Sequence, residues 1–179
     1  MSWSIALLAR LSLSAVFLVS AGSKLATAPA RGAFAEAVTV FGRVPARWSR
    51  VAAGLVVLIE LAAAVGLCVS PLSRPALYGA AALLLAFALA LAVGLRRGVM
   101  IPCACFGASH APARPPEIWR NLLLAALAVI GAARDGAPTA LLAGPAAAVV
   151  DRLIIAAFVT VLAAGFADFT DVLHPRRAA

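Results

Sequence analysis

The sequence predicts an all-α fold: a polytopic bundle of membrane-crossing helices that forms a single domain over residues 1–179. Of the 179 residues, 64% are hydrophobic and only 12% are charged, and the mean hydropathy is +1.04, whereas soluble domains are roughly half apolar and about a quarter charged. Apolar runs long enough to cross about 30 Å of hydrocarbon recur along the chain. The basic residues behind the net charge of +8 lie in short connections between those runs. This placement is typical of topology determinants, so we expect membrane lipid as the surroundings and no nucleic-acid partner.

The first apolar run, residues 3–22, is predicted to be a spanning helix that carries one charge, Arg10. A cleaved signal peptide would have basic residues before its apolar core, whereas here the basic cluster follows the run. Residues 28–50 are expected to form a polar connection punctuated by Pro and Gly, with a short interfacial helix at about residues 34–41.

Four further apolar runs predict spanning helices. Proline residues separate the second run from the third, because proline lacks the backbone donor that a continuous helix needs. The fourth run is short and begins with aromatic and basic residues that suit the membrane interface. The fifth follows a Gly-Pro pair and carries two charges. The expected spans cover residues 51–69, 76–95, 118–133 and 146–166.

Five spans would place the two chain ends on opposite faces of the membrane. One face, which we call the basic end, then holds the connection after the first span, the connection after the third span and the C-terminal tail. The opposite end has only Arg74 and Arg134, so the positive-inside rule predicts that the basic end and the C-terminus are cytoplasmic and that the N-terminus lies outside. The basic end collects eleven residues: Lys24, Arg31, Arg43, Arg47, Arg50, Arg96, Arg97, Arg114, Arg120, Arg176 and Arg177.

Three charged residues, Arg10, Glu60 and Arg152, lie inside predicted spans, where an unpaired charge is expensive. Counted at about 1.5 Å per residue, all three fall roughly 9–14 Å below the opposite end. We therefore predict an ion pair of Glu60 with Arg10 or Arg152 that ties the first, second and fifth spans together. Such a pair is either a purely structural staple or a proton or substrate site.

The connection after the third span contains Cys103-Ala104-Cys105, preceded by Pro102 and followed shortly by Gly107. Two thiols one residue apart can form a dithiol/disulfide couple, hold a soft metal, or serve as two small residues in a tight turn. The Cα atoms of residues i and i+2 can be about 7 Å apart, near the upper limit for a disulfide, so a bond between them requires a turn. A strained bond of this kind is easily reduced, which favours exchange over permanent cross-linking.

The neighbours expected at the same end refine these alternatives. Lys24, Arg120 and Asn121 are predicted at the membrane edge beside the cysteines, and a cation near a thiol favours the nucleophilic thiolate. Lys24 could equally be an interface anchor. Exchange would pass through a mixed disulfide, with one thiolate attacking and the other resolving.

Two other residues bear on this chemistry. His110 extends the cysteine pair to three soft ligands, which would suit copper, zinc or mercury. Cys68 is expected near the opposite end of the second span, too far to pair with the motif, as a buried packing cysteine.

Four motifs lie within or beside the apolar runs: Ala21-Gly22-Ser23-Lys24-Leu25, Glu60 followed by Gly66, Cys103-Ala104-Cys105-Phe106-Gly107, and Arg120-Asn121. Together they resemble the MauE family, methylamine-utilisation membrane proteins within the wider DoxX-like group. The similarity covers about residues 5–133, and the Cys-x-Cys-Phe-Gly element is its most specific part.

The resemblance implies a DoxX-like four-helix core with an added fifth helix in a bacterial plasma membrane. It implies action with a thioredoxin-like partner in disulfide formation and in maturation of the small subunit of methylamine dehydrogenase, an exported substrate protein. Cys103 and Cys105 are then the redox pair. Lys24, Glu60 and Asn121 become framework or site positions, with Lys24 placed in the catalytic set. A quinone cofactor is an expectation by analogy with membrane thiol oxidases only.

Two other functions stay open at this point. One is a soft-metal binding or transport protein that uses Cys103, Cys105 and His110. The other is a non-catalytic membrane assembly factor for a neighbouring enzyme.

Overall fold

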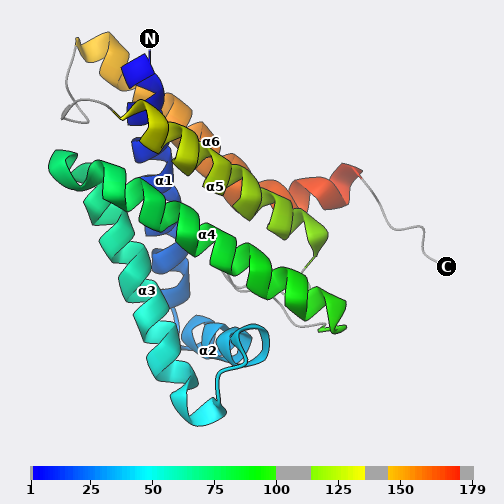
Figure 1. Cartoon of the computed structure of the whole chain (residues 1–179). Helices are drawn as coiled ribbons and strands as arrows, with labels where there is room; N and C mark the ends of the chain where they lie inside the picture. The colour runs from blue at the N-terminus through cyan, green and yellow to red at the C-terminus, as the bar shows by residue number, and fades with distance from the viewer. Residues whose placement is uncertain (1, 100–113, 136–144, 174–179) are drawn as a thin grey trace.

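The computed structural model describes residues 2–99, 114–135 and 145–173, and within these ranges the chain is helical, which confirms the all-α prediction. Figure 1 shows the arrangement of the helices. In chain order they are α1 (Ser2–Leu25), α2 (Ala28–Gly42), α3 (Ala46–Cys68), the short 3-10 helix η1 (Ser70–Leu72), α4 (Ser73–Arg96), α5 (Pro115–Arg134) and α6 (Ala146–Leu173).

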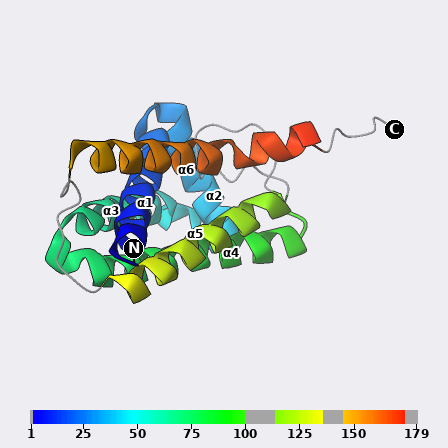
Figure 2. The ribbon, with the colours of Figure 1, turned by 90° about the horizontal axis from the view of Figure 1, so that it is seen from above.

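Helix α1 lies at the centre of the bundle and contacts all the other α-helices. Seen from above, it stands between α6 on one side and α3, α4 and α5 on the other (Figure 2). In its most apolar stretch 61% of the residues are buried, against 28% for α3 and 33% for the η1–α4 segment. The outer helices therefore turn wide apolar faces outward, as expected of helices that contact lipid.

Among the described residues, four segments are long and apolar enough to cross a membrane, which identifies a multi-pass membrane protein. They are Ile5–Leu25, Ala46–Cys68, Ser70–Arg96 and Pro115–Arg134. Helix α6 includes the predicted fifth span, residues 146–166, and its place in the membrane stays a prediction.

The connection between the first two spans is more helical than predicted. Instead of a short helix at residues 34–41, the 15-residue α2 occupies most of it, and α3 begins at Ala46 rather than Val51. The hydroxyl of Thr27 caps α2 by accepting the backbone N–H of Ala30 at 3.2 Å. The helix ends where Arg43 adopts a left-handed φ of 56°.

The helices pack through small residues. A Cβ atom added to Gly131 of α5 would lie 2.7 Å from the Cβ of Ala9 in α1 and 3.4 Å from a methyl of Leu77 in α4. A Cβ atom on Gly94 would lie 2.3 Å from the ring of Phe41, so α2 is seated directly on the end of α4. Close backbone approach of this kind is how membrane helices gain van der Waals contact, since lipid offers no hydrophobic driving force between them.

The end of α1, helix α2 and the start of α3 lie in the lower part of the molecule in Figure 1, and the end of α4 lies to their right with the start of α5 above it. Helix α2 contacts α1, α3 and α4, and α4 packs along α5. These helix ends flank the connections after the first and third spans, which are two of the three parts of the basic end defined from the sequence. The sidedness of that end in the membrane stays a prediction.

Candidate functional site

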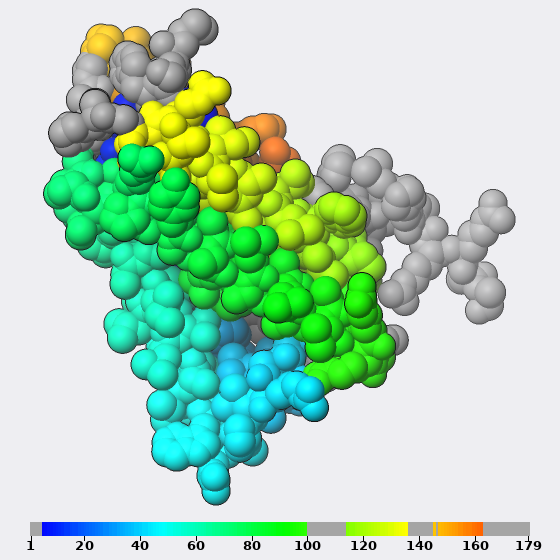
Figure 3. Space-filling model, viewed as in Figure 1, coloured from blue at the N-terminus to red at the C-terminus, as the bar shows by residue number. Residues whose placement is uncertain are grey.

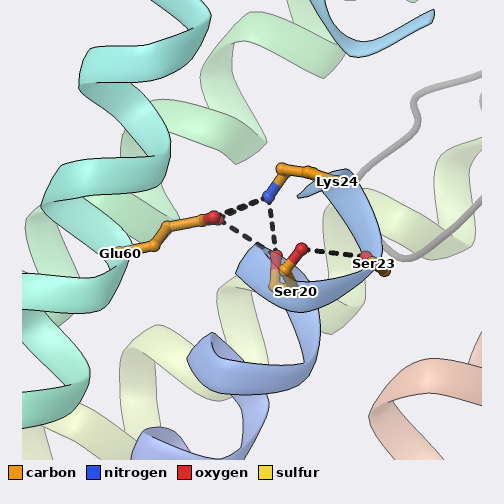
Figure 4. A network of polar contacts seen from close by, with 4 residues as sticks. All are labelled: Ser20, Ser23, Lys24 and Glu60. Carbon is orange, nitrogen blue, oxygen red and sulfur yellow. Dashed lines mark hydrogen bonds and ion pairs between the residues drawn. The ribbon is translucent and has the colours of Figure 1, made fainter. Parts of the chain in front are cut away.

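A buried ion pair joins the central helix to α3. The ammonium of Lys24 lies 2.6 Å and 2.8 Å from the two carboxylate oxygens of Glu60. Lys24 is 2% exposed and Glu60 is fully buried. Figure 4 shows the two side chains reaching toward each other from α1 and α3.

Ser20 completes this network from one turn earlier on α1. Its hydroxyl accepts a hydrogen bond from the Lys24 ammonium at 2.7 Å and donates one to Glu60 Oε1 at 3.0 Å (Figure 4). The ammonium also lies 4.8 Å from the ring centroid of Phe34 and 5.6 Å from that of Phe87, within the range of cation–π attraction. We call Ser20, Lys24 and Glu60 the Lys–Glu network.

The network satisfies the demands that a buried charge makes. Isolated, each ion would lose its hydration on entering the bundle, at a cost of several kcal/mol. Here both carboxylate oxygens accept from Lys24, and the serine hydroxyl adds one bond to each partner. Removing either partner would therefore leave a buried charged group without its counter-ion.

A small cavity adjoins the network. It measures about 10 Å³ and is lined by Ser20, Glu60 and Asn121 together with apolar residues of α1 and α4. Among the described residues the buried Asn121 Nδ2 has no hydrogen-bond partner. A cavity that holds one water needs roughly 10–15 Å³ and two or more polar partners. The space thus has the size and lining to let one water connect Asn121 to the carboxylate.

The first turns of α5 bring further polar side chains into the bundle. Arg120 is 5% and Asn121 is 2% exposed, and both lie at the same end as Lys24. Sequence reasoning missed Glu117, a buried carboxylate flanked by the charges of Arg114 and Arg120. Its spacing of three residues from Arg120 at a predicted helix start was the signal that could have indicated it.

The predicted partner of Glu60 is wrong, since the structure pairs Glu60 with Lys24 rather than with Arg10 or Arg152. Depth counting assumed that the helices begin flush at one surface, but α1 and α3 are staggered. Arg10 Nε donates to the carbonyl of Leu67 at 2.9 Å. Ser20, which faces Glu60, follows Arg10 by ten residues on α1, about 15 Å along the axis.

Arg152 fails to reach Glu60 for a different reason. Helix α6 packs on α1 and α5, and in the described part of the chain it makes no contact with α3. Arg152 is nevertheless buried, at 6% exposure. The predicted staple of the first, second and fifth spans is therefore a staple of α1 and α3 alone.

The expectation for Cys68 also needs correction. It is the last residue of α3 and is exposed rather than buried. Its sulfur lies 3.4 Å from the hydroxyl of Ser14, which donates to the carbonyl of Ala64 at 3.1 Å. A position at the helix end leaves the thiol outside the close packing that surrounds Ala64.

Cys103, Cys105 and His110 lie outside the described residues. Helix α4 ends at Arg96 and α5 begins at Pro115, and these two helix ends lie near each other on the right of the molecule in Figure 1. Within the described ranges, no group of three or more His, Cys, Asp or Glu residues could hold a metal ion.

Fold and site together define a multi-pass helical membrane protein with a charged network buried inside the bundle. A family model described as methylamine utilisation protein MauE matches residues 2–134, which include α1 to α5. Methylamine utilization protein MauE of Paracoccus denitrificans is 41% identical over 136 residues, 73% of this chain and 69% of the relative. No solved structure matches. The chain belongs to the MauE family, which confirms the resemblance seen in the sequence motifs.

Proposed function

We propose that this protein acts in methylamine utilisation as a membrane thiol–disulfide exchange protein that uses Cys103 and Cys105 with a thioredoxin-like partner. Membership of the MauE family supports the metabolic context. The chemistry is inferred from the paired thiols. The physiological substrate would be an exported protein that needs disulfides, as the resemblance implies for the methylamine dehydrogenase small subunit.

The observation that carries the proposal is that arginines lie at the helix ends on either side of residues 97–114, the cysteine segment, which contains Cys103 and Cys105. The helix that enters this segment ends with Arg96, and the helix that leaves it begins beside Arg114 and buries Arg120 in its second turn. Cations near a thiol favour the thiolate, the nucleophile of disulfide exchange. The three arginines outnumber the one buried carboxylate among them, Glu117, so the net positive charge of these helix ends would favour reaction at the two cysteines.

The exchange balances without a further reactant. One thiolate of the Cys103/Cys105 pair attacks a disulfide sulfur of the partner, and the other partner sulfur leaves as a thiolate that takes up a proton. The second cysteine of the pair loses its proton and attacks the mixed disulfide. An intramolecular Cys103–Cys105 bond then forms and the partner departs as a dithiol. Two electrons pass from the pair to the partner, and the reverse sequence passes them back.

Thiol trapping followed by mass spectrometry tests the proposal. Cells that grow on methylamine through this protein are quenched in acid and alkylated, and the redox state of the pair is read from peptide masses. We expect a Cys103–Cys105 disulfide whose fraction changes with oxidant and reductant. In the Cys105→Ser or Cys103→Ser variant we expect a trapped mixed disulfide with the partner and loss of growth on methylamine.

Cys68→Ser is the matched control. This thiol is the last residue of α3, at the end of the helix away from the basic end, and it takes no part in the proposed exchange. It should leave both growth and the disulfide fraction unchanged. Stoichiometric tight metal with no disulfide would instead identify the soft-metal function of Cys103, Cys105 and His110. If the Cys103→Ser and Cys105→Ser variants both grew normally on methylamine, thiol exchange would be rejected, and the non-catalytic assembly factor would be the remaining function.

A further inference from the structure

A groove of about 370 Å³ opens on the surface between the end of α1, helix α2 and the start of α3. Its size falls within the roughly 300–1,000 Å³ of small-molecule sites. Three cations line it, namely Lys24, Arg31 and Arg50, and the rest of its wall is apolar or glycine. The groove is separate from the second hollow of the molecule, about 290 Å³ between α2, α3 and α4, whose lining is apolar throughout and which opens on the face seen in Figure 3.

The groove carries an uncompensated positive charge. Lys24 is neutralised by Glu60, which faces it from α3. Arg31 Nη1 donates to the carbonyl of Leu25 at 2.9 Å, a neutral partner. Within the described ranges Arg50 has no carboxylate partner, and no Asp or Glu lines the groove. Two arginines without a carboxylate partner in the described ranges therefore line the groove, and their positive charge is available to an anion.

The floor of the groove is apolar, and two glycines leave it open. A Cβ atom added to Gly32 of α2 or to Gly54 of α3 would meet nothing within 4 Å. Ala53 and Val57 continue the apolar wall along α3 toward the middle of the bundle. The charged rim thus lies near the start of α3, and the apolar wall extends inward from it.

We propose that this groove binds one anionic phospholipid, with its phosphate at Arg31 and Arg50 and the first part of an acyl chain along Gly32, Gly54 and Val57. The occupant follows from charge and placement. The groove lies at the basic end of a membrane-spanning bundle, and arginines at the edge of a membrane attract anionic head groups with about 1 kcal/mol each. A soluble anion would satisfy the arginines but not the apolar wall, whereas a phospholipid satisfies both.

Lipid titration of the full-length protein in mixed micelles, followed by native mass spectrometry, tests the site. Phosphatidylglycerol should bind with a stoichiometry of one, and phosphatidylethanolamine should bind much more weakly. Arg31→Gln and Arg50→Gln should each weaken phosphatidylglycerol binding about fivefold. The controls are Arg43→Gln and Arg47→Gln, which remove exposed charges of the same end outside the groove.

A diffuse attraction predicts that all four arginine variants weaken binding equally, and that result would overturn the proposal. The apolar part of the site has its own pair of variants. Gly54→Leu should fill the groove and reduce phosphatidylglycerol binding, whereas Gly79→Leu, also in open space but on α4, should not. If glycerol phosphate, which lacks acyl chains, competed as well as the lipid, the site would be a plain anion site.

This site is independent of the proposed thiol exchange. Cys103→Ser should bind phosphatidylglycerol as the unchanged protein does, so failure of one proposal leaves the other standing.

Discussion

At the scale of single residues, the Lys–Glu network joins α1 to α3 through charged side chains that are almost entirely buried. A lysine and a glutamate that are almost fully buried share two hydrogen bonds, and a serine hydroxyl bonds to both of them. Replacing a buried pair by apolar residues is often neutral for stability, whereas removing one partner is not. This asymmetry separates a structural role of the pair from a chemical one.

We predict that Glu60→Gln and Lys24→Met each lower the free energy of unfolding by about 3–5 kcal/mol, because each leaves one buried charge unpaired. The double variant Lys24→Met/Glu60→Leu should recover most of this loss. Thermal unfolding in detergent measures the stabilities. Ser14→Ala serves as the control, since it removes a neutral hydrogen bond between the same two helices and should cost only about 1 kcal/mol.

Growth on methylamine, measured on the same variants, then decides the role of the pair. A stable double variant that grows normally would show that the pair only ties α1 to α3. A stable double variant that fails to grow would show that Lys24 or Glu60 takes part in function. A single variant as stable as the unchanged protein would contradict the burial argument itself.

The sequence indicates that Glu60 needs a buried partner, because a charge in the middle of an apolar run cannot remain unpaired. It does not identify Lys24 as that partner. The long lysine side chain reaches inward from the helix end, and the stagger of α1 against α3 depends on contacts such as Arg10 to Leu67. Neither the reach of the Lys24 side chain nor the stagger of the two helices can be predicted from the position of a residue within its own apolar segment.

At the scale of helices, glycine determines how closely the central elements approach. Gly131 allows α5 to lie against both α1 and α4, and its nearest neighbour is the Cβ atom of Ala9, which no rotamer change can move. Gly94 faces the ring of Phe41, a side chain that can turn. The two glycines are thus predicted to differ in their tolerance of a methyl group.

We expect Gly131→Ala to destabilise the protein by about 1–3 kcal/mol, because α5 must move away from α1 to admit the added carbon. Gly79→Ala is the matched control on α4, where the added carbon meets open space, and it should be neutral or stabilise by roughly 0.5–1 kcal/mol through helix propensity. Thermal unfolding of the two variants in the same detergent checks the difference. Equal midpoints would show that α5 does not pack as closely as the structure indicates.

Helix α2 is longer than the sequence predicts, since it spans Ala28–Gly42 and not only residues 34–41. Pro29 and the glycines of residues 28–50 suggest a connection, yet Pro at a helix start is favourable and Thr27 supplies the cap. Phe34 and Phe41 are buried on one side of this helix. Their spacing of seven residues places them on one face of a helix. That this face is buried depends on the contacts of α2 with α3 and α4, which the sequence of residues 28–50 does not indicate.

At the scale of the whole molecule, the fold class follows from hydropathy, since lipid leaves the backbone no alternative to helices or closed barrels. The grouping of helix ends follows from the number of spans. What could not be predicted are the groove beside Arg31 and Arg50 and the small cavity beside Asn121. Both lie between helices, so their existence depends on packing angles and not on any single segment.

The charge distribution predicts a cytoplasmic basic end, whereas formation of disulfides in an exported protein takes place outside. A membrane-impermeant maleimide can resolve this conflict. In a variant without Cys68, Cys103 and Cys105, single cysteines are introduced at exposed positions of the two ends by Arg47→Cys and Arg74→Cys. Intact cells should label the Arg74→Cys protein only, and permeabilised cells should label both. Labelling of the Arg47→Cys protein from outside would place the basic end, and with it the helix ends that flank residues 97–114, on the outer side of the membrane, where the proposed exported substrate would be.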